Sequence, residues 1–290
     1  MRVLTDEDVD RVAPERAVAA MREALEAHRD DRLIAPVRVS SSEDDEATVL
    51  TAGALRDAYY GFRAYARGNP HGDQVVALFD RGTWALEALI AGRLLGPRRT
   101  GAIGAVAVDV LSHPDATDVA VIGTGTQAFS QLWALRAVRR PARVRVFGRE
   151  RARREAFAAR CRDVLAMPAE AAPSAEAAVR DAEIVLVATS SARPVIEAGW
   201  VAPGAHVSTL GAKMVDAHEC PPELVRRASL VATDSPAQLD DYGATPLCTA
   251  VGRPAVALSS LLGHGSAPSC RVRAGSAPRR RRSTSPITKR

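Results

Sequence analysis

The chain has 290 residues, of which 47% are hydrophobic and 25% are charged, so it contains enough apolar residues for two domains with hydrophobic cores. No apolar run is long enough to span a membrane, and the first residues show no export signal, so we expect a cytoplasmic protein without a membrane partner. The four cysteines lie far apart and form neither a CxxC motif nor a Cys/His metal site.

The net charge of +5 belongs to the last residues of the chain. Residues 264–290 contain eight Lys and Arg residues and no acid, so the rest of the chain carries a charge of −3. Four consecutive arginines among Ser and Pro are typical of a disordered tail with weak affinity for polyanions, and we expect no specific nucleic-acid partner. The abrupt change of composition near residue 263 leads to the hypothesis that the reading frame shifts there, by natural truncation or by sequencing error.

The first 112 residues predict an α+β domain. Thr5, which three acids follow, fits a capped first turn, and Pro14 fits the start of a helix with apolar residues at positions 18, 21 and 25. Strand patterns follow over residues 34–39, 47–50 and 58–65, and residues 74–79 and 83–90 predict a hairpin. A helix of small residues over 97–111 ends the domain.

The most informative stretch is Gly123-x-Gly125-x-x-Ala128, which follows four apolar residues and precedes a helical pattern. This order predicts the strand, tight turn and helix of a dinucleotide-binding unit. Gly123 permits the turn, Gly125 permits a pyrophosphate to approach the backbone, and Ala128 keeps the helix close to the sheet.

Strands and helices alternate beyond this turn. Residues 144–147, 184–188, 207–210 and 230–233 predict strands, and residues 150–163 and 174–179 predict helices. The alternation predicts an α/β fold with a Rossmann-type doubly wound parallel sheet, in which ligands bind at the carboxyl ends of the strands. We expect domains over residues 1–112 and 113–245, a return segment to the first domain over 246–263, and a disordered tail over 264–290.

The carboxyl ends of the strands supply the expected cofactor-binding residues. They are Gly123, Thr124, Gly125, Gln127, Ala128, Gly148, Arg149, Arg151, Thr189, Ser190 and Gly211. Arg149 and Arg151 lie roughly 20 residues past the glycines and favour NADP over NAD, because a guanidinium binds a 2′-phosphate that a carboxylate would repel. The alternative is that both arginines only solvate the start of a helix.

Several motifs together resemble the ornithine cyclodeaminase and mu-crystallin family, which includes ketimine reductases and amino-acid dehydrogenases. They are Ala35-Pro-Val-Arg38, Tyr60-Gly-Phe-Arg63, Arg99-Thr100-Gly-Ala, the glycine turn, Arg193-Pro194, Leu210-Gly-Ala-Lys213 and His218-Glu219, in the family's order over residues 1–263. The resemblance implies a nicotinamide-dependent reaction at a bond between an α-carbon and nitrogen, a small amino-acid or imino-acid substrate, and a homodimer formed through the first domain.

The resemblance also implies roles for individual residues. Arg38, Arg63 and Arg99 would hold the substrate carboxylate, and Arg99 with Thr100 would lie near the cofactor. Position 63 is Arg where cyclodeaminases and mu-crystallin have Lys, and an arginine that keeps its proton is a better carboxylate anchor than an acid. Lys213 stands where cyclodeaminases have the Asp that handles the substrate amine, so like charge disfavours ornithine cyclisation.

Several residues are candidates for the proton donor. Arg63 and Lys213 are the candidate catalytic residues. Lys213 can donate a proton to the substrate nitrogen if burial and neighbouring arginines lower the proton affinity of its amine. The alternative is a lysine paired at the surface with Asp216 or Glu219. His218 and His71 are further candidate acids.

The sequence therefore predicts an NADPH-dependent enzyme that reduces a small 2-imino acid or interconverts it with an amino acid. One alternative is a cyclodeaminase that acts on ornithine or lysine with tightly bound NAD. The other is a non-catalytic protein that binds NADPH and an amino-acid-like ligand, because Arg63, Lys213 and the altered tail depart from the family's pattern.

Overall fold

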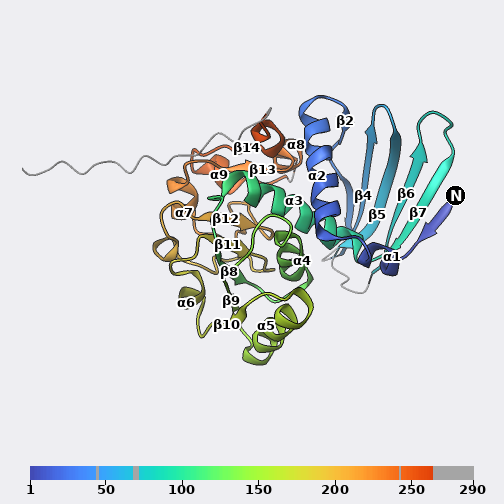
Figure 1. Cartoon of the computed structure of the whole chain (residues 1–290). Helices are drawn as coiled ribbons and strands as arrows, with labels where there is room; N and C mark the ends of the chain where they lie inside the picture. The colour runs from blue at the N-terminus through green and yellow to red at the C-terminus, as the bar shows by residue number, and fades with distance from the viewer. Residues whose placement is uncertain (44–45, 68–71, 242, 264–290) are drawn as a thin grey trace, which may run out of the picture.

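The computed structural model describes residues 1–43, 46–67, 72–241 and 243–263. Two lobes lie side by side, one built on a seven-stranded sheet and the other on a five-stranded sheet (Figure 1). Helices α2 (Pro14–Arg29) and α3 (Leu95–Leu111) lie between the two sheets. This arrangement confirms the predicted α/β fold, with an α+β lobe ahead of a Rossmann-type lobe.

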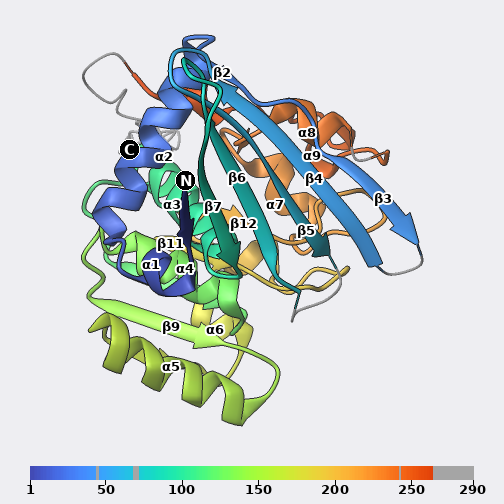
Figure 2. The same cartoon turned by 90° about the vertical axis from the view of Figure 1, so that its right-hand side faces the viewer.

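The N-terminal sheet has the strand order β1-β7-β6-β5-β4-β2, and β3 pairs with β4. Its strands are β1 (Arg2–Leu4), β2 (Leu33–Ile34), β3 (Val39–Glu43), β4 (Glu46–Leu55), β5 (Tyr59–Arg67), β6 (Gln74–Asp80) and β7 (Leu86–Gly92). Only β1 on β7 is a parallel pair among the described strands of this sheet. One face of the sheet lies toward α2 and α3, and the other is its outer face (Figure 2). Successive residues of each strand belong to opposite faces.

Two strands of this lobe differ from the prediction. The strand expected over 34–39 is split into β2 and β3, because Pro36 has no backbone N–H to donate to a ladder. The second strand of the hairpin begins at Leu86 rather than at residue 83. The backbone N–H of Thr83 donates to Asp80 Oδ1 at 2.7 Å, and Trp84 takes a left-handed conformation with φ of 62°, so these residues form the turn.

The start of α3 is held by the N-terminal helix α1 (Asp6–Asp10). The Asp6 carboxylate accepts hydrogen bonds from the backbone N–H groups of Arg93, at 2.9 Å, and Leu94, at 2.8 Å. A carboxylate at this position satisfies donors that have no partner within the helix and interacts favourably with the helix dipole. The first turn of α3, which directly precedes Arg99 and Thr100, is therefore fixed against α1.

The second lobe is a parallel sheet with the strand order β10-β9-β8-β11-β12. Its strands are β8 (Asp118–Ile122), β9 (Arg143–Phe147), β10 (Ala169–Ala171), β11 (Ile184–Val187) and β12 (His206–Thr209), and its helices are α4 (Thr126–Leu135), α5 (Arg151–Leu165) and α6 (Ala175–Val179). The chain adds strands on one side of β8 and then crosses to the other side. The carboxyl end of β8, where the glycine turn lies, is therefore the switch point at which such sheets bind ligands.

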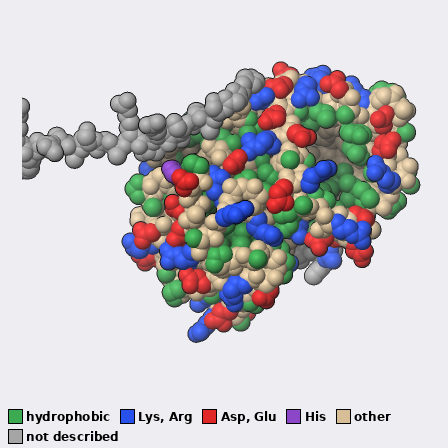
Figure 3. Space-filling model, viewed as in Figure 1, with side chains coloured by type: hydrophobic (Ala, Val, Ile, Leu, Met, Phe, Trp, Pro, Cys, Tyr) green, Lys and Arg blue, Asp and Glu red, His purple; other side chains and the backbone are tan. Residues whose placement is uncertain are grey.

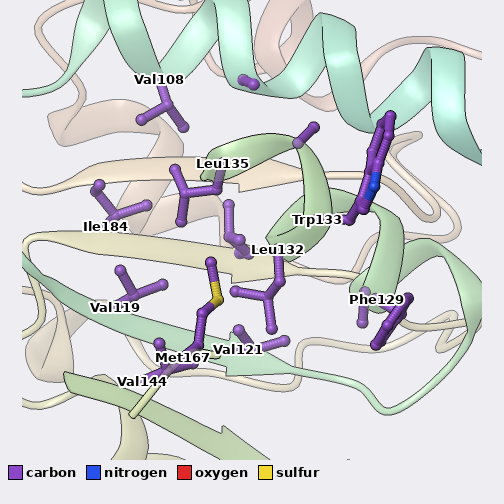
Figure 4. Packing of buried hydrophobic residues seen from close by; sticks show 14 of the residues in the cluster. Val108, Val119, Val121, Phe129, Leu132, Trp133, Leu135, Val144, Met167 and Ile184 are labelled. Atoms are coloured by element: carbon purple, nitrogen blue, oxygen red, sulfur yellow. The ribbon is translucent and has the colours of Figure 1, made fainter. Parts of the chain in front are cut away.

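The main core lies between α3, α4 and this sheet (Figure 4). Leu132 and Leu135 of α4 are buried against Val119 and Val144 of the strands. On the other side of α4, a Cβ at Gly101 would lie 2.2 Å from the backbone oxygen of Ser130. Glycine in α3 thus lets the two helices pack closely, which places Thr100 beside Gln131 of α4.

The end of the described chain returns to the first lobe. The strand expected over 230–233 forms as β13 (Ala232–Thr233), but it pairs with β14 (Val256–Ala257) in a separate two-stranded sheet and not with the five-stranded sheet. The prediction that it extends the Rossmann sheet was wrong, because residues 210–221 fold back over the ends of β11 and β12 and carry the chain away from the sheet edge.

Four short helical segments complete this region. They are α7 (Pro222–Arg227), α8 (Pro236–Asp240), α9 (Leu247–Ala250) and the 3-10 helix η2 (Leu258–Leu261). The η2 segment lies against α2, where Ser259 Oγ is 3.0 Å from His28 Nδ1 and the Leu262 oxygen accepts from Arg29 at 2.8 Å. The basic tail over residues 264–290, to which the reading-frame hypothesis refers, lies outside the described residues.

Among the described helices, none is both long and apolar enough to cross a membrane. On the face shown in Figure 3, basic and acidic side chains are interspersed over both lobes.

Candidate active site

Three arginines from separate segments influence one another electrostatically. Arg63 lies on β5, Arg99 on α3, and Arg38 between β2 and β3. Burial, followed by the positive charges of Arg99 and Arg38, lowers the pKa of Arg63 to about 10. Burial and the charge of Arg38 likewise lower the pKa of Arg99. These residues, which we call the arginine cluster, concentrate positive charge between α3 and the first sheet, and such a cluster attracts an anion.

Residues from the end of the described chain border the arginine cluster. The backbone N–H of Arg38 donates to Gln238 Oε1 at 2.8 Å, which ties this segment to α8. Asp234, which precedes α8, raises the pKa of Arg99 against the larger effects of burial and Arg38. The sequence did not reveal Asp234 or Gln238 as site residues, because only tertiary contact brings them beside arginines far away in the chain.

The glycine turn has the geometry expected of a dinucleotide site. Gly123 has φ of 118°, and a Cβ there would lie 2.2 Å from the backbone oxygen of Ala188, so glycine is required. Gly125 precedes α4, and no described atom lies within 4 Å of the position its Cβ would take. The buried Oε1 of Gln127 has no hydrogen-bond partner among the described residues. An open approach to a helix N-terminus and an unpartnered polar atom both fit a bound nucleotide.

The other expected cofactor residues lie around this turn. A Cβ at Gly148 would lie 2.9 Å from Thr124 Cγ2, so the ends of β8 and β9 are in contact. A Cβ at Gly211 would lie 2.4 Å from the Thr189 oxygen, which places the ends of β11 and β12 together. Ser190 follows Thr189 directly and is exposed. The structure thus brings these residues to one edge of the sheet.

The two arginines past β9 differ in their surroundings. Arg149 and Arg151 are both exposed, and Arg151 Nε lies 2.7 Å from Glu155 Oε1, one turn further along α5. Arg151 is therefore paired with a carboxylate at the exposed start of α5, where the alternative to a phosphate contact placed both arginines. Glu150 lies 3.4 Å from Arg153 and is the N-cap residue of α5. Arg149 is the remaining candidate for a 2′-phosphate at this strand end.

Lys213 and its neighbours follow the end of β12. Lys213 forms a backbone bridge with His218, and its carbonyl oxygen accepts from Leu247 N at 2.9 Å. Glu219 is 0% exposed and is therefore not a surface residue, whereas Asp216, the other partner considered for Lys213, is exposed. His218 Nδ1 lies 3.1 Å from the Met214 oxygen, and His71 lies outside the described residues.

Thr100, which directly follows Arg99 of the arginine cluster, contacts α4. Its hydroxyl donates to the Gly96 oxygen at 2.9 Å, and its carbonyl oxygen accepts from Gln131 Nε2 of α4 at 3.2 Å. The arginine cluster is therefore linked through one helix to the element that begins at the dinucleotide turn.

The family model of the ornithine cyclodeaminase/mu-crystallin family matches residues 8–262. The chain belongs to this family. A putative dehydrogenase of Rhizobium meliloti (strain 1021) is 30% identical over 245 residues, which are 80% of this chain and 74% of that protein. The Δ1-pyrroline-2-carboxylate reductase of Paracoccus denitrificans is 30% identical over 253 residues, or 83% of this chain and 79% of that protein.

Other members of the family extend the comparison. Ketimine reductase mu-crystallin of Mus musculus is 30% identical over 168 residues, so the match spans 58% of this chain and about half of that protein, 52%. The solved structure of Thermococcus litoralis Δ1-pyrroline-2-carboxylate reductase, in complex with NADH and L-proline, has a TM-score of 0.81 and 24% identity. The match covers 90% of this chain and 86% of that chain, and it shows that the two proteins share a fold.

These matches confirm the predicted family and its fold, and they confirm that the relatives include imino-acid reductases that use nicotinamide cofactors. The assignment of individual residues to substrate and cofactor stays a prediction, as does the choice of NADP over NAD.

Proposed function

We propose that the protein is an NADPH-dependent reductase of small 2-imino acids, which also catalyses the reverse oxidation of the corresponding amino acid. The observation that carries the proposal is the arginine cluster, in which burial and neighbouring positive charge lower the pKa values of Arg63 and Arg99. A carboxylate relieves this repulsion, and the planar guanidinium groups bind it with directional hydrogen bonds. Every 2-imino acid has such a carboxylate beside the reacting carbon.

The Rossmann lobe supplies the second half of the site. Gly125 and the start of α4 receive the pyrophosphate, Arg149 binds the 2′-phosphate, and Thr189 with Gly211 borders the nicotinamide half. When bound, the reduced nicotinamide supplies a hydride to the imine carbon. Lys213 or a water molecule donates the proton that the imine nitrogen takes up.

The arginine cluster accounts for orientation rather than for proton transfer. A carboxylate fixed by Arg38, Arg63 and Arg99 leaves the imine carbon one bond away, so its position relative to the Rossmann lobe is also fixed. Holding two reactants in this way lowers the entropic part of the barrier. The 30% identity to a Δ1-pyrroline-2-carboxylate reductase over most of both chains supports a cyclic imino acid as substrate.

The test compares Arg99→Gln with Arg153→Gln, a change at an exposed arginine of α5. NADPH oxidation is followed with Δ1-pyrroline-2-carboxylate and with the carboxamide of the same imine. We expect Arg99→Gln to raise KM for the carboxylate about tenfold or more, the loss expected for a hydrogen bond to a charged group, and to leave the carboxamide unaffected. An Arg99→Gln variant that behaves as Arg153→Gln does would contradict the proposal.

The outer face of the first sheet supports a homodimer. Val39, Leu50 and Phe62 are 68%, 44% and 40% exposed, respectively. The pairings of Val39 with Leu50 and of Ala52 with Phe62 place all three on this face. An apolar face of this kind is covered in an assembly, and a second copy of the chain supplies a matching sheet.

Light scattering after gel filtration tests this part of the proposal. We expect the wild type to have the mass of a dimer and Phe62→Glu to be a folded monomer. A monomeric wild type, or a dimeric Phe62→Glu variant, would show that this face is not the dimer interface.

A further inference from the structure

The Arg63 guanidinium is held on two sides by residues of the first sheet. Its Nε donates to Gln74 Oε1 at 2.6 Å, and its Cζ lies 4.1 Å from the centre of the Tyr65 ring. Arg63 and Tyr65 are two residues apart on β5 and share a face, and Gln74 is the partner of Tyr65 across the β5–β6 ladder. The three side chains thus lie together on the face toward α3.

Helix α3 provides the third side. A Cβ at Gly96 would lie 2.7 Å from Arg63 Nη2 and 2.9 Å from Gln74 Oε1. Gly96 is in the first turn of α3, one turn before Arg99. The space left by the missing side chain of Gly96 and the charge of Arg99 are therefore on the same side of the helix. Glycine is less favourable than alanine in a helix, and here the space it leaves is filled by the arginine.

These contacts have different effects on the guanidinium. Gln74 fixes the position of Nε, so the Nη nitrogens are the donors that face an incoming anion. The Tyr65 ring is attracted to the positive charge and offsets part of the cost of burial. Tyr65 also raises the pKa of Arg63, against the lowering by burial and by the other arginines.

We propose that Tyr65, Gln74 and Gly96 form a socket that positions the Arg63 guanidinium for a substrate carboxylate, and that Gly96 leaves the space that an arginine at position 63 requires. The inference rests on the proposed function, in which Arg63 binds that carboxylate. A guanidinium that is already held in one orientation loses less side-chain entropy when it binds. Tyr65, Gln74 and Gly96 are positioning residues, because they act through Arg63.

A double-mutant cycle of Gly96→Ala and Arg63→Lys tests the socket. The methyl group added by Gly96→Ala would displace the Arg63 guanidinium. A lysine at position 63 has a shorter, unbranched side chain and leaves room for this methyl group. We expect Gly96→Ala to weaken binding of pyrrole-2-carboxylate about tenfold in the wild-type background and less than about twofold in the Arg63→Lys background, as coupled residues do. Calorimetry with saturating NADPH measures this binding without turnover.

Two controls separate this effect from general damage. Gly199→Ala adds a methyl group where no described atom lies within 4 Å, and we expect it to leave binding unchanged. The unfolding temperature without ligand is measured for each variant, since alanine in the first turn of α3 also favours the helix. Equal weakening by Gly96→Ala in both backgrounds, or no weakening in either, would overturn the proposal.

Substitutions of Tyr65 show whether its ring or its hydroxyl is required. We expect Tyr65→Phe to retain KM and kcat for Δ1-pyrroline-2-carboxylate within about twofold, and Tyr65→Leu to raise KM about tenfold with little change in kcat, because only leucine lacks the aromatic face. A large fall in kcat for Tyr65→Phe would instead identify the hydroxyl as the proton donor and overturn the positioning role.

Different results would contradict the proposed function and the Arg63 socket. A wild type that neither binds pyrrole-2-carboxylate nor reduces an imine contradicts the proposed function, and the socket with it. A wild type that does both, with additive effects in the cycle, contradicts the socket alone.

Discussion

Glu219 accepts hydrogen bonds from both donors of Thr189, the backbone N–H at 3.1 Å and the hydroxyl at 2.8 Å, although 30 residues separate the two in the chain. Its other carboxylate oxygen accepts from the backbone N–H groups of Leu210, at 2.8 Å, and Gly211. Burial raises the pKa of Glu219, and these donors oppose the shift. One buried carboxylate therefore joins the ends of β11 and β12, which border the proposed nicotinamide half of the site.

This relationship predicts that Glu219→Gln is strongly destabilising despite its nearly unchanged shape. An amide nitrogen cannot accept a hydrogen bond, so one side of the new residue meets donors only. We expect the free energy of unfolding in urea to fall by about 2–3 kcal/mol. Glu155→Gln, which removes an exposed pair with Arg151, should change it by less than about 0.5 kcal/mol. Equal stability of the two variants would contradict this role of Glu219.

Gly123→Ala tests the turn after β8. The backbone there has φ of 118°, and the new methyl group would lie 2.2 Å from a backbone oxygen that cannot rotate away. We expect a loss of about 3 kcal/mol in the free energy of unfolding, together with weaker NADPH binding. Gly199→Ala is the matched change in open space and should leave both within about 0.5 kcal/mol of the wild type. A Gly123→Ala variant with the stability of this control would show that the turn tolerates a side chain.

His206 predicts a loss of stability on acidification. Burial, with a smaller contribution from Arg139, lowers the pKa of His206 from 6.5 to about 4. Between these values the unfolded chain binds the proton and the folded protein does not, so stability is complete above pH 6.5 and is lost as the pH falls toward 4. The full effect is about 3 kcal/mol.

Urea unfolding at several pH values compares the wild type with His206→Gln. The raised pKa of Glu219 acts in the opposite direction, but it is common to both proteins and cancels in the difference. We expect the stability of His206→Gln to fall less steeply from pH 6.5 downward. Parallel curves would show that His206 titrates alike in the folded and unfolded states.

Arg149→Ala tests the preference for NADPH. Arg149 is exposed, so its removal should not change stability, but it should weaken NADPH binding about tenfold or more by removing a charge-assisted contact to the 2′-phosphate. NADH binding should stay within about twofold, since NADH lacks this phosphate. Arg151→Ala should have the smaller effect on NADPH, because Glu155 already pairs with that guanidinium. Nicotinamide fluorescence measures each affinity, and equal losses for NADPH and NADH would argue against a phosphate contact.

Local patterns in the sequence predicted most of the architecture. The apolar run before Gly123, the two glycines and Ala128 specified the strand, turn and helix at the switch point, because each has a local steric reason. The predicted strand over 230–233 failed in its pairing, since only two of its residues form a strand and its partner lies more than 20 residues further along the chain. Short strands have no periodicity that identifies their partner.

The arginines were predicted from motif resemblance, whereas the residues that hold them were not. Gly96 and Gln74 have no unusual local pattern, and their roles follow from atoms that approach only when α3 packs on the sheet. Tyr65 offered one weak signal, because it shares a strand face with Arg63 at a spacing of two residues. Glu219 appeared as one member of a matching motif and as a possible surface partner of Lys213, and its burial depends on the fold of residues 210–221.

The most direct test of the central claim is the fate of the hydride. The wild type is incubated with Δ1-pyrroline-2-carboxylate and NADPH that carries two deuterium atoms at C4 of the nicotinamide. The account predicts that proline forms with one deuterium at its α-carbon and that one NADPH is oxidised for each proline. Tight NADPH binding without product across cyclic and open-chain imino acids, or ornithine cyclisation without net oxidation of the cofactor, would contradict it.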